Sequence, residues 1–222
     1  MNPVSRTLRI FTQGNRSAED PISKFALAKG NQQMNPAVFF FILAGAISGN
    51  ALTSERTLFD FSQPNAEKWR SVNDGVMGGR SVGSSKINGE KNLEFSGRLS
   101  LENNGGFSSI RTRGNNLNMA EGDSVVLRVR GDGRSYNMNL YSQSNLGGYS
   151  FRQSFQTRKG EWIEVKLPVE QFRATWRGRS YSRVRLDPAQ VKGMGILLGD
   201  KKPGPFRLEV AWIKIARSNA GE

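Results

Sequence analysis

The feature that most constrains the fold is a series of short alternating segments between residues 57 and 216, separated by clusters of Gly, Asn and Asp. In Ser124–Arg130, three apolar side chains point one way and two arginines point the other, which is the period-two pattern of a β-strand. Tyr136–Tyr141 alternates in the same way. Comparable runs predict strands at Thr57–Phe61, Leu93–Ser96, Phe107–Arg111, Ser124–Arg130, Tyr136–Tyr141, Phe151–Thr157, Trp162–Leu167, Met194–Leu198 and Phe206–Ile215.

Helical signals are confined to single turns at Pro168–Phe172 and Pro188–Val191. Many short strands without helices predict an all-β protein, built as an antiparallel β-sandwich or jelly roll. The last run places Phe206, Leu208, Val210 and Trp212 on one face, and Ile213 breaks the alternation, so we expect a bulge or burial on both sides there. We expect residues 57–216 to form this one domain, followed by a short tail at 217–222.

The first 56 residues differ from the rest because Ala37–Ile47 is an uninterrupted apolar run of 11 residues. A membrane-spanning helix needs about 20 such residues, so the run is too short to span. It matches the core of an export signal, and the small residues at 48–51 could be cleaved. The alternatives are a mitochondrial presequence, translation from Met34, or a buried first strand. We expect 1–56 to be a targeting segment, which gives an exported, membrane-associated or mitochondrial protein whose only membrane contact is this run.

The chain of 222 residues contains no Cys and no His. This composition excludes Ser-His-Asp and Cys-His nucleophiles, the usual zinc sites and disulfides. The glycine loop at 75–80 lacks the pattern of nucleotide-binding loops, and no segment has the carboxylates of a metal site, so we expect neither metal nor cofactor. With 32 basic and 19 acidic residues the net charge is +13, which admits acidic partners.

Three glycine-bearing loops, at 73–81, 103–107 and 130–136, are candidates for a binding face or for simple turns. A jelly roll brings distant loops to one end, so we expect the three to converge, with Asp74 and Asp132 paired to arginines rather than catalytic. The candidate binding residues are Asp74, Gly75, Met77, Gly78, Gly79, Arg80, Asn104, Gly105, Gly106, Phe107, Arg111, Asp132, Arg134 and Tyr136.

The segment Phe172–Arg185 interleaves arginines with aromatic residues. This pattern fits a solvated strand pair, a protein-docking surface, or contacts to nucleic acid, of which we favour protein over nucleic acid. The residues of this candidate partner patch are Arg173, Trp176, Arg177, Arg179, Tyr181, Arg183 and Arg185.

A series of short motifs runs in order through the unit from 57 to 216. It includes Phe59-Asp60-Phe61, Asn73–Ser81, Asn104–Phe107, Arg130–Arg134, Leu167-Pro168, Arg177-Gly178-Arg179, Gly195–Leu198, Gly204-Pro205-Phe206 and Trp212-Ile213. Taken in order, these motifs resemble the domain of complex I intermediate-associated protein 30, a respiratory complex I assembly factor. The resemblance implies a galactose-binding-like jelly roll. It also implies an assembly or chaperone role, and the family has no catalytic motif to carry over.

We therefore expect a non-catalytic binding module whose partner is another protein, such as a subunit or intermediate of a membrane respiratory complex. The alternative is a carbohydrate- or glycan-binding jelly roll, because loop Asn, Asp and aromatic residues also suit sugars. A sugar site needs an exposed aromatic platform beside polar groups, whereas a protein site needs a larger apolar or Arg-aromatic patch.

Overall fold

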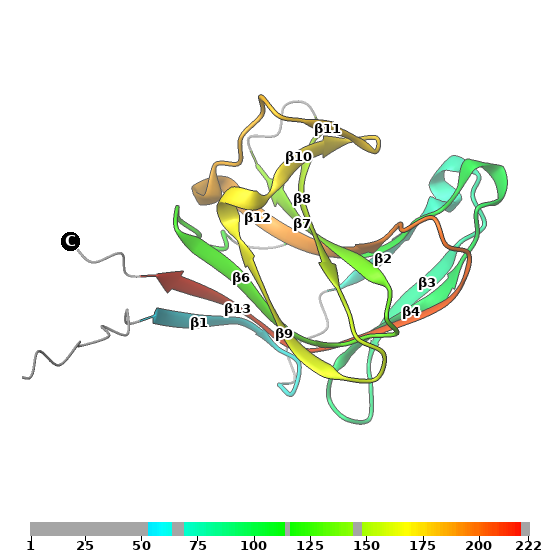
Figure 1. Ribbon diagram of the computed structural model, residues 1–222, viewed down its shortest axis with the longest axis horizontal. Coiled ribbons are helices and arrows are strands. Elements are labelled where there is room, and N and C mark those ends of the chain that lie inside the picture. The colour runs from blue at the N-terminus through cyan, green and yellow to red at the C-terminus, as the bar shows by residue number, and fades with distance from the viewer. Residues whose placement is uncertain (1–52, 64–68, 114–115, 144–147, 219–222) are drawn as a thin grey trace, which may run out of the picture. The chain divides into compact units, whose positions relative to one another are not determined.

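The computed structural model describes residues 53–63, 69–113, 116–143 and 148–218, which form two antiparallel β-sheets packed face to face (Figure 1). The predicted fold class, an all-β sandwich, is confirmed. The apolar run at 37–47 lies outside the described residues, and its targeting role stays a prediction. Within the part that is described, no helix has the length and hydropathy to cross a membrane.

The first sheet has six strands, ordered β3-β4-β13-β6-β9, with β1 paired to β13. The 15-residue β13 is long enough to pair with β4 along its first half and with β1 along its second. β1 begins four residues before residue 57, where we expected the domain to start. The strands are β1 (Thr53–Asp60), β3 (Val82–Ile87), β4 (Leu93–Leu99), β6 (Asp123–Arg130), β9 (Trp162–Pro168) and β13 (Gly204–Ser218).

The second sheet has seven strands, ordered β11-β10-β8-β7-β12-β5-β2. They are β2 (Arg70–Asn73), β5 (Ser108–Arg113), β7 (Ser135–Ser142), β8 (Ser150–Gln156), β10 (Arg173–Trp176), β11 (Arg179–Tyr181) and β12 (Val191–Leu198). Short 3₁₀ turns connect several strands. They are η1 (Asp74–Met77), η2 (Glu102–Asn104), η3 (Val169–Gln171) and η4 (Pro188–Gln190), and the last two confirm the predicted single turns.

The core lies between the two sheets and follows from the alternation of their strands. Tyr136, Met138 and Leu140 of β7 are fully buried, as are the inward residues of β12. Phe95 of β4 meets Tyr136 from the facing sheet, with ring centroids 6.5 Å apart, and Phe206 of β13 edge-on at 4.9 Å. Each such side chain contributes about 1.5–3 kcal/mol by leaving water, so the core holds the fold together without disulfides.

The predicted irregularity in β13 is present, and it corrects the predicted face. The register between β13 and β6 shifts between Val210 and Trp212. This bulge exchanges the two faces of the strand, so that Ile213 and Ile215 continue the core while Trp212 turns away and is half-buried. The Trp212 ring instead receives the Lys214 ammonium at 4.5 Å.

Candidate ligand groove

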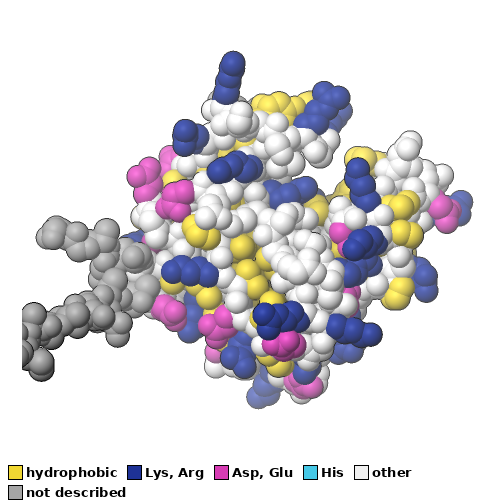
Figure 2. Space-filling model, viewed as in Figure 1, with side chains coloured by type: hydrophobic (Ala, Val, Ile, Leu, Met, Phe, Trp, Pro, Cys, Tyr) yellow, Lys and Arg dark blue, Asp and Glu magenta, His cyan; other side chains and the backbone are white. Residues whose placement is uncertain are grey.

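The outer face of the seven-stranded sheet is hollowed into a groove of about 1400 Å³. Figure 2 shows this hollow in profile, between the lobe that carries β10 and β11 and the lobe that carries η1 and η2, with Lys and Arg on both sides. Its volume exceeds the roughly 300–1,000 Å³ typical of small-molecule pockets, so it suits an extended ligand. The groove is lined chiefly by Met77, Phe107, Arg111, Asn139, Tyr141, Arg152, Trp176, Arg177, Lys192 and Leu197.

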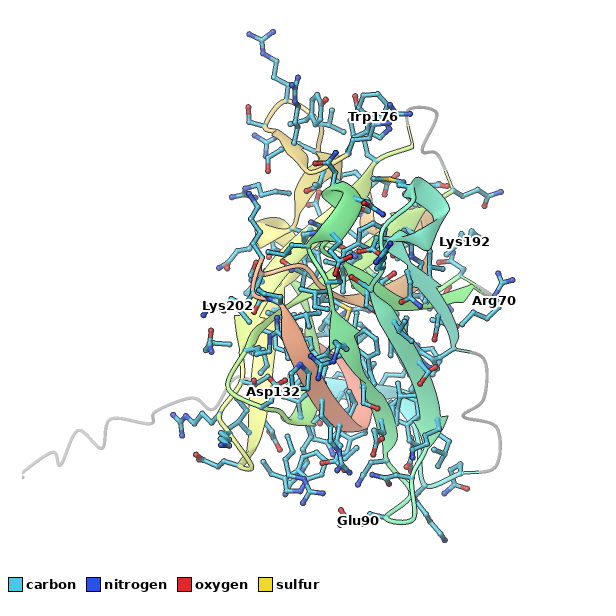
Figure 3. The ribbon with its side chains drawn as sticks, turned by 90° about the vertical axis from the view of Figure 1, so that its right-hand side faces the viewer. Arg70, Glu90, Asp132, Trp176, Lys192 and Lys202 are labelled. Atoms are coloured by element: carbon cyan, nitrogen blue, oxygen red, sulfur yellow. The ribbon has the colours of Figure 1, made fainter. Side chains whose placement is uncertain are left out.

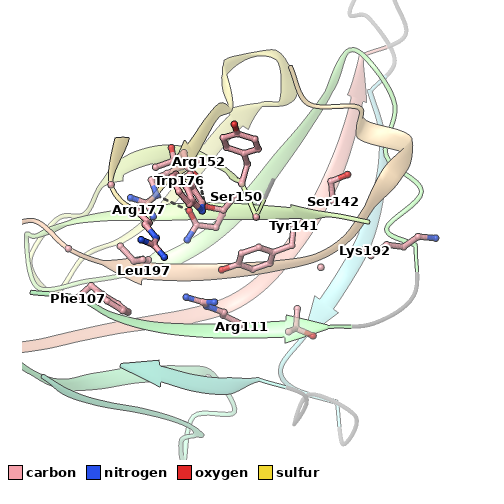
Figure 4. A pocket seen from close by; sticks show the side chains of 18 of the residues that line it. Phe107, Arg111, Tyr141, Ser142, Ser150, Arg152, Trp176, Arg177, Lys192 and Leu197 are labelled. Carbon is pink, nitrogen blue, oxygen red and sulfur yellow. Dashed lines mark hydrogen bonds between the residues drawn. The ribbon is translucent and has the colours of Figure 1, made fainter. Parts of the chain in front are cut away.

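The floor of the groove consists of the side chains that alternate with the core residues. Because Met138 and Leu140 point inward on β7, Asn139 and Tyr141 point outward. On β8, Phe151 is inside and Arg152 outside, and on β5, Ile110 is inside and Arg111 outside. Figure 4 shows Arg111 and Tyr141 together on this floor, beneath Arg152 and Trp176.

Gly195 of β12 makes room for these large side chains. It pairs with Arg111 of β5 on one side and Asn139 of β7 on the other. A Cβ at this position would lie 2.7 Å from the carbonyl oxygen of Ile110 and 2.9 Å from Tyr141 Oη. Glycine inside a strand often marks such a close approach, and here it lets Arg111 and Tyr141 lie across the sheet.

The two floor arginines are held in place by neutral groups. Arg152 Nε donates to Asn139 Oδ1 at 2.9 Å, and Arg111 Nε donates to Ser109 Oγ at 3.2 Å. Arg111 also lies 5.5 Å from the ring centroid of Tyr141. Burial lowers the pKa of Arg152, Tyr141 acts in the opposite direction, and the positive charge of Arg111 lowers it further. The groove floor is therefore positively charged and partly desolvated.

The rim of the groove is formed by the turn between β10 and β11. Trp176 pairs with Arg179 across a two-residue turn, in which Arg177 and Gly178 both have positive φ. This geometry is that of a tight hairpin, and it folds the Arg177 guanidinium over the Trp176 ring at 4.9 Å. Trp176 remains 41% exposed, so this rim offers an Arg-aromatic surface to a ligand.

The first two glycine loops converge on Asp74, as the sequence predicts, but without an arginine. The Asp74 carboxylate accepts hydrogen bonds from the backbone and hydroxyl of Ser81 and from the backbone of Gly106 and Phe107. Burial raises the pKa of Asp74, but these hydrogen bonds together hold it below its ordinary value. The predicted ion pair is wrong, because Arg80 instead meets the exposed Glu102 at 2.8 Å and Arg111 lies in the groove.

Glycine at this cluster serves close packing. A Cβ at Gly105 would stand 2.6 Å from Asp74 Oδ2, and Gly79 also packs directly against this side chain. Gly78 caps η1 in the left-handed region, and its carbonyl accepts from Asn103. The remaining predicted residues here, Gly75 and Asn104, are exposed.

The third loop belongs to a separate cluster. Arg134 forms a bidentate pair with Asp200, at 2.6 and 3.0 Å, while Asp132 accepts from Tyr136 Oη at 3.1 Å and from the Arg207 backbone. Burial, and then Asp132, raises the pKa of Tyr136. β5 and β7 both start beside Leu198, so all three loops lie at one end of the sheet. They do not form one site.

The predicted partner patch is also divided. Trp176 and Arg177 line the groove, whereas the other members do not. Tyr181 packs against Tyr149 with centroids 5.1 Å apart, and Arg173 Nη1 donates to the carbonyl of Glu170. The members that are exposed away from the groove are Arg179, Arg183 and Arg185.

Most of the groove lining was not predicted from the sequence, including the polar and charged floor residues Asn139, Tyr141, Arg152 and Lys192. The alternation that predicts the inward residues of β7 and β8 also fixes which side chains point outward. Gly195, a glycine inside the predicted strand Met194–Leu198, was a further signal of close packing. The predicted residues that do line the groove are Met77, Gly106, Phe107, Arg111, Trp176 and Arg177.

These features define a class of fold, the jelly-roll β-sandwich, here with a groove on the outer face of one sheet. A family model described as Complex I intermediate-associated protein 30 (CIA30) matches residues 59–210. The chain belongs to this family, in agreement with the resemblance of its motifs.

The relatives share only part of their length with this chain. The protein of Caenorhabditis elegans named "Probable complex I intermediate-associated protein 30, mitochondrial" is 36% identical over 96 residues, which cover 41% of this chain and 28% of that protein. The Drosophila melanogaster relative is 27% identical over 180 residues, covering 70% and 61%. The Mus musculus relative is 34% identical over 102 residues, covering 42% and 30%.

Solved structures agree on the fold. A family 11 carbohydrate-binding module from Clostridium thermocellum, in complex with a mixed-linked tetrasaccharide, aligns with a TM-score of 0.57 and 15% identity. The alignment covers 74% of this chain and 96% of that chain. The agarase AgWH50C aligns with a TM-score of 0.52 and 14% identity, over 76% of this chain and 25% of its own. At such identities the likeness shows the shared jelly roll.

Proposed function

We propose that this chain is a non-catalytic module that binds a protein partner, a subunit or an intermediate of a membrane respiratory complex, during its assembly. The observation that carries the proposal is the groove, which is larger than a small-molecule pocket and has an Arg-aromatic rim of the kind enriched in protein-binding hot spots. Family membership supports the role, because the relatives are named for an association with complex I intermediates.

Two further expectations accompany this proposal. The relatives are named mitochondrial, which supports the mitochondrial alternative for the N-terminal segment over the export alternative. The absence of His and Cys from the sequence excludes Cys nucleophiles and nucleophiles activated by His, which supports a non-catalytic role.

The test is capture of the partner from the native cell. The tagged full chain is cross-linked in cells, purified and examined by mass spectrometry, in parallel with a Trp176→Ala, Arg177→Ala double variant. We expect subunits of a respiratory complex with the unmodified chain and their loss with the double variant. A control variant, Arg183→Ala with Arg185→Ala, removes two arginines outside the groove and should retain them. Equal recovery with an unrelated tagged protein would contradict the proposal.

A second candidate function is carbohydrate binding. The exposed Trp176 beside polar groove residues such as Asn139 and Ser150 is the platform that sugar recognition requires. The related fold in the Clostridium thermocellum module holds a tetrasaccharide. Titration calorimetry with a neutral β-1,3-1,4 tetrasaccharide discriminates the two. Binding that is lost in Trp176→Ala and insensitive to salt would favour the sugar.

A further inference from the structure

The seven-stranded sheet carries an unbalanced charge. Within the bounds of its strands there are seven Lys or Arg residues and no Asp or Glu. The six-stranded sheet, by contrast, balances its nine Lys or Arg residues with six acidic residues in its strands, which are Glu55, Asp60, Glu94, Asp123, Glu164 and Glu209. The two faces of the sandwich therefore differ in what they attract.

The strand register aligns four of these arginines in one row across the sheet. Arg70 of β2 stands opposite Arg111 of β5, which stands opposite Gly195 of β12. Gly195 is opposite Asn139 of β7, which is opposite Arg152 of β8. Arg152 is in turn opposite Arg173 of β10. Residues directly opposite in antiparallel strands point to the same face. We call Arg70, Arg111, Arg152 and Arg173 the arginine row.

The arginine row has no internal counter-charge. None of its four members forms an ion pair within 4 Å with an acidic residue that the structure describes, whereas arginines of the other sheet, such as Arg130 and Arg207, do so. For Arg111 and Arg152 the hydrogen bonds to described residues involve Nε, which leaves the terminal nitrogens for an acceptor from outside. Like charges directly opposite each other destabilise a sheet, so an arrangement of this kind calls for a bound anion.

The shape of the groove selects among anions. Arg111 and Arg152 are half-buried on the floor of a concave face, where the flat surface of a lipid bilayer does not reach them. A nucleic acid strand fits less well, because bases stack on exposed aromatic rings and the exposed Trp176 ring on the rim is already covered on one side by Arg177. Guanidinium forks bind carboxylates in a bidentate manner.

The length of the row fits a peptide. Its five strand intervals, at about 4.8 Å each, span about 24 Å. An extended chain rises about 3.3 Å per residue, so roughly seven residues cover this distance. We propose that the groove binds an extended acidic segment of a polypeptide partner. Its carboxylates pair with Arg111 and Arg152 on the groove floor and, where the segment runs past the groove, with Arg70 and Arg173 at the ends of the row. This inference rests on and deepens the proposed function, because it names the chemistry of the partner segment.

The test uses purified full chain and a fluorescent 12-residue peptide with Glu at four alternate positions, with anisotropy as the readout. The matched peptide has Gln in place of each Glu. We expect binding that weakens with added salt and is at least tenfold weaker for the Gln peptide. Arg152→Gln and Arg111→Gln should each weaken binding of the Glu peptide at least tenfold. Arg70→Gln, on an exposed edge strand, provides a variant that leaves the floor contacts intact and should weaken it severalfold.

The control is Arg98→Gln, which removes one exposed charge from the other sheet and should change affinity less than twofold. An equal loss in this control would overturn the inference, because net charge alone would then explain binding. Tighter binding of a 12-nucleotide oligo-dT, or of vesicles with one-fifth phosphatidylglycerol, lost in the same variants, would also overturn it.

The two proposals fail separately. If the Glu peptide does not bind but respiratory subunits are still captured through Trp176 and Arg177, the acidic segment is wrong and the proposed function stands. If the peptide binds as expected but no respiratory subunit is captured, the arginine row is a carboxylate receptor and the proposed function is wrong.

Discussion

Asp74 is a buried carboxylate whose charge is balanced by hydrogen bonds from two loops. Its four donors come from Ser81, Gly106 and Phe107, so one side chain ties the loop after β2 to the loop before β5. Each hydrogen bond to a charged group contributes about 1.5–3 kcal/mol net, and a buried donor left without its partner has a cost of similar size. The role of Asp74 is therefore the shape of this end of the sheet, next to the groove wall at Met77 and Phe107.

Replacing Asp74 should weaken the fold. We expect Asp74→Asn to lower the free energy of unfolding by about 3 kcal/mol, because the amide offers one acceptor and adds donors where donors already converge. Chemical denaturation at pH 7 measures the change. Asp187→Asn is the matched control, since Asp187 is an exposed cap of η4 and Asn caps equally well. Unchanged stability in Asp74→Asn, with loss of partner capture, would instead make Asp74 a binding residue.

At the scale of elements, β12 shapes the groove through its glycines. Gly195 lies at the centre of the row that joins β5, β12, β7 and β8, and its missing side chain is the space that Arg111 and Tyr141 occupy. Figure 3 shows Lys192, at the start of the same strand, at one side of the molecule and well away from Asp132. β12 thus leaves space on the groove floor at Gly195 and adds one further positively charged side chain, that of Lys192.

Gly195→Ala should therefore disturb both stability and binding. Its Cβ would meet a backbone oxygen at 2.7 Å, which does not yield as a flexible side chain does. We expect a loss of about 1–3 kcal/mol in unfolding free energy and a weaker affinity for the acidic peptide. Gly89→Ala, in a turn with open space around it, should change stability by less than about 0.5 kcal/mol. Full peptide affinity in Gly195→Ala would show that the floor geometry is not needed.

We expect the arginine row to lower the stability of the fold slightly, because its like charges repel each other. Arg70 and Arg111 stand opposite each other on β2 and β5 without an acidic neighbour. Arg70→Gln should raise the free energy of unfolding by about 0.3 kcal/mol at low salt, and this gain should vanish at high salt. Arg98→Gln, which faces no like charge across β4, should show no such gain. Thermal melts at two salt concentrations measure both variants, and a destabilised Arg70→Gln would count against the row.

The sequence predicts the long strands of this fold better than the short ones. β6 and β7 were predicted to within one residue at each end, whereas the predicted run Met194–Leu198 is only the second part of β12. The strands β2, β3, β10 and β11 were not predicted. Arg70–Asn73 and Arg179–Tyr181 are too short to show the two-residue alternation of a β-strand, and Val82–Ile87 consists mostly of small and polar residues. The arginine row could not be predicted from the sequence for a different reason. It depends on register between strands distant in sequence, such as β5 and β12, which no local pattern contains.

Across the whole molecule, the two sheets differ in how their charged side chains are paired. In the six-stranded sheet, the nearly buried Glu209 meets Arg130 at 2.7 Å and Arg207 at 3.1 Å, and Asp123 meets Arg217 at 2.8 Å. These pairs give the buried carboxylates of that sheet a counter-charge. The strands of the other sheet carry seven Lys or Arg residues and no acidic residue, so the unbalanced positive charge within the strands is greatest on the sheet that holds the groove.

This arrangement predicts how stability depends on pH. Hydrogen bonds from Arg130 hold the pKa of Glu209 below its ordinary value despite burial. Burial raises the pKa of Asp200, but the bonds from Arg134 and the Lys202 backbone lower it more, and Asp74 behaves alike. A carboxyl with a lowered folded pKa binds protons more readily in the unfolded chain. Its contribution is therefore present above the unfolded pKa, near 4, and is lost as pH falls through the folded pKa.

The chain has no His, so no side chain of ordinary pKa titrates between pH 6 and 8. We expect the free energy of unfolding to be nearly constant across that range and to fall steeply below about pH 4. Denaturant melts between pH 2.5 and 8 measure this profile. In Asp74→Asn the free energy of unfolding should fall less steeply below about pH 4, because one group whose protonation is linked to folding has been removed. In Asp187→Asn it should fall as steeply as in the unmodified chain. A stability maximum near pH 5, or an equally steep fall at low pH in Asp74→Asn, would contradict the assignment of acid sensitivity to these buried carboxylates.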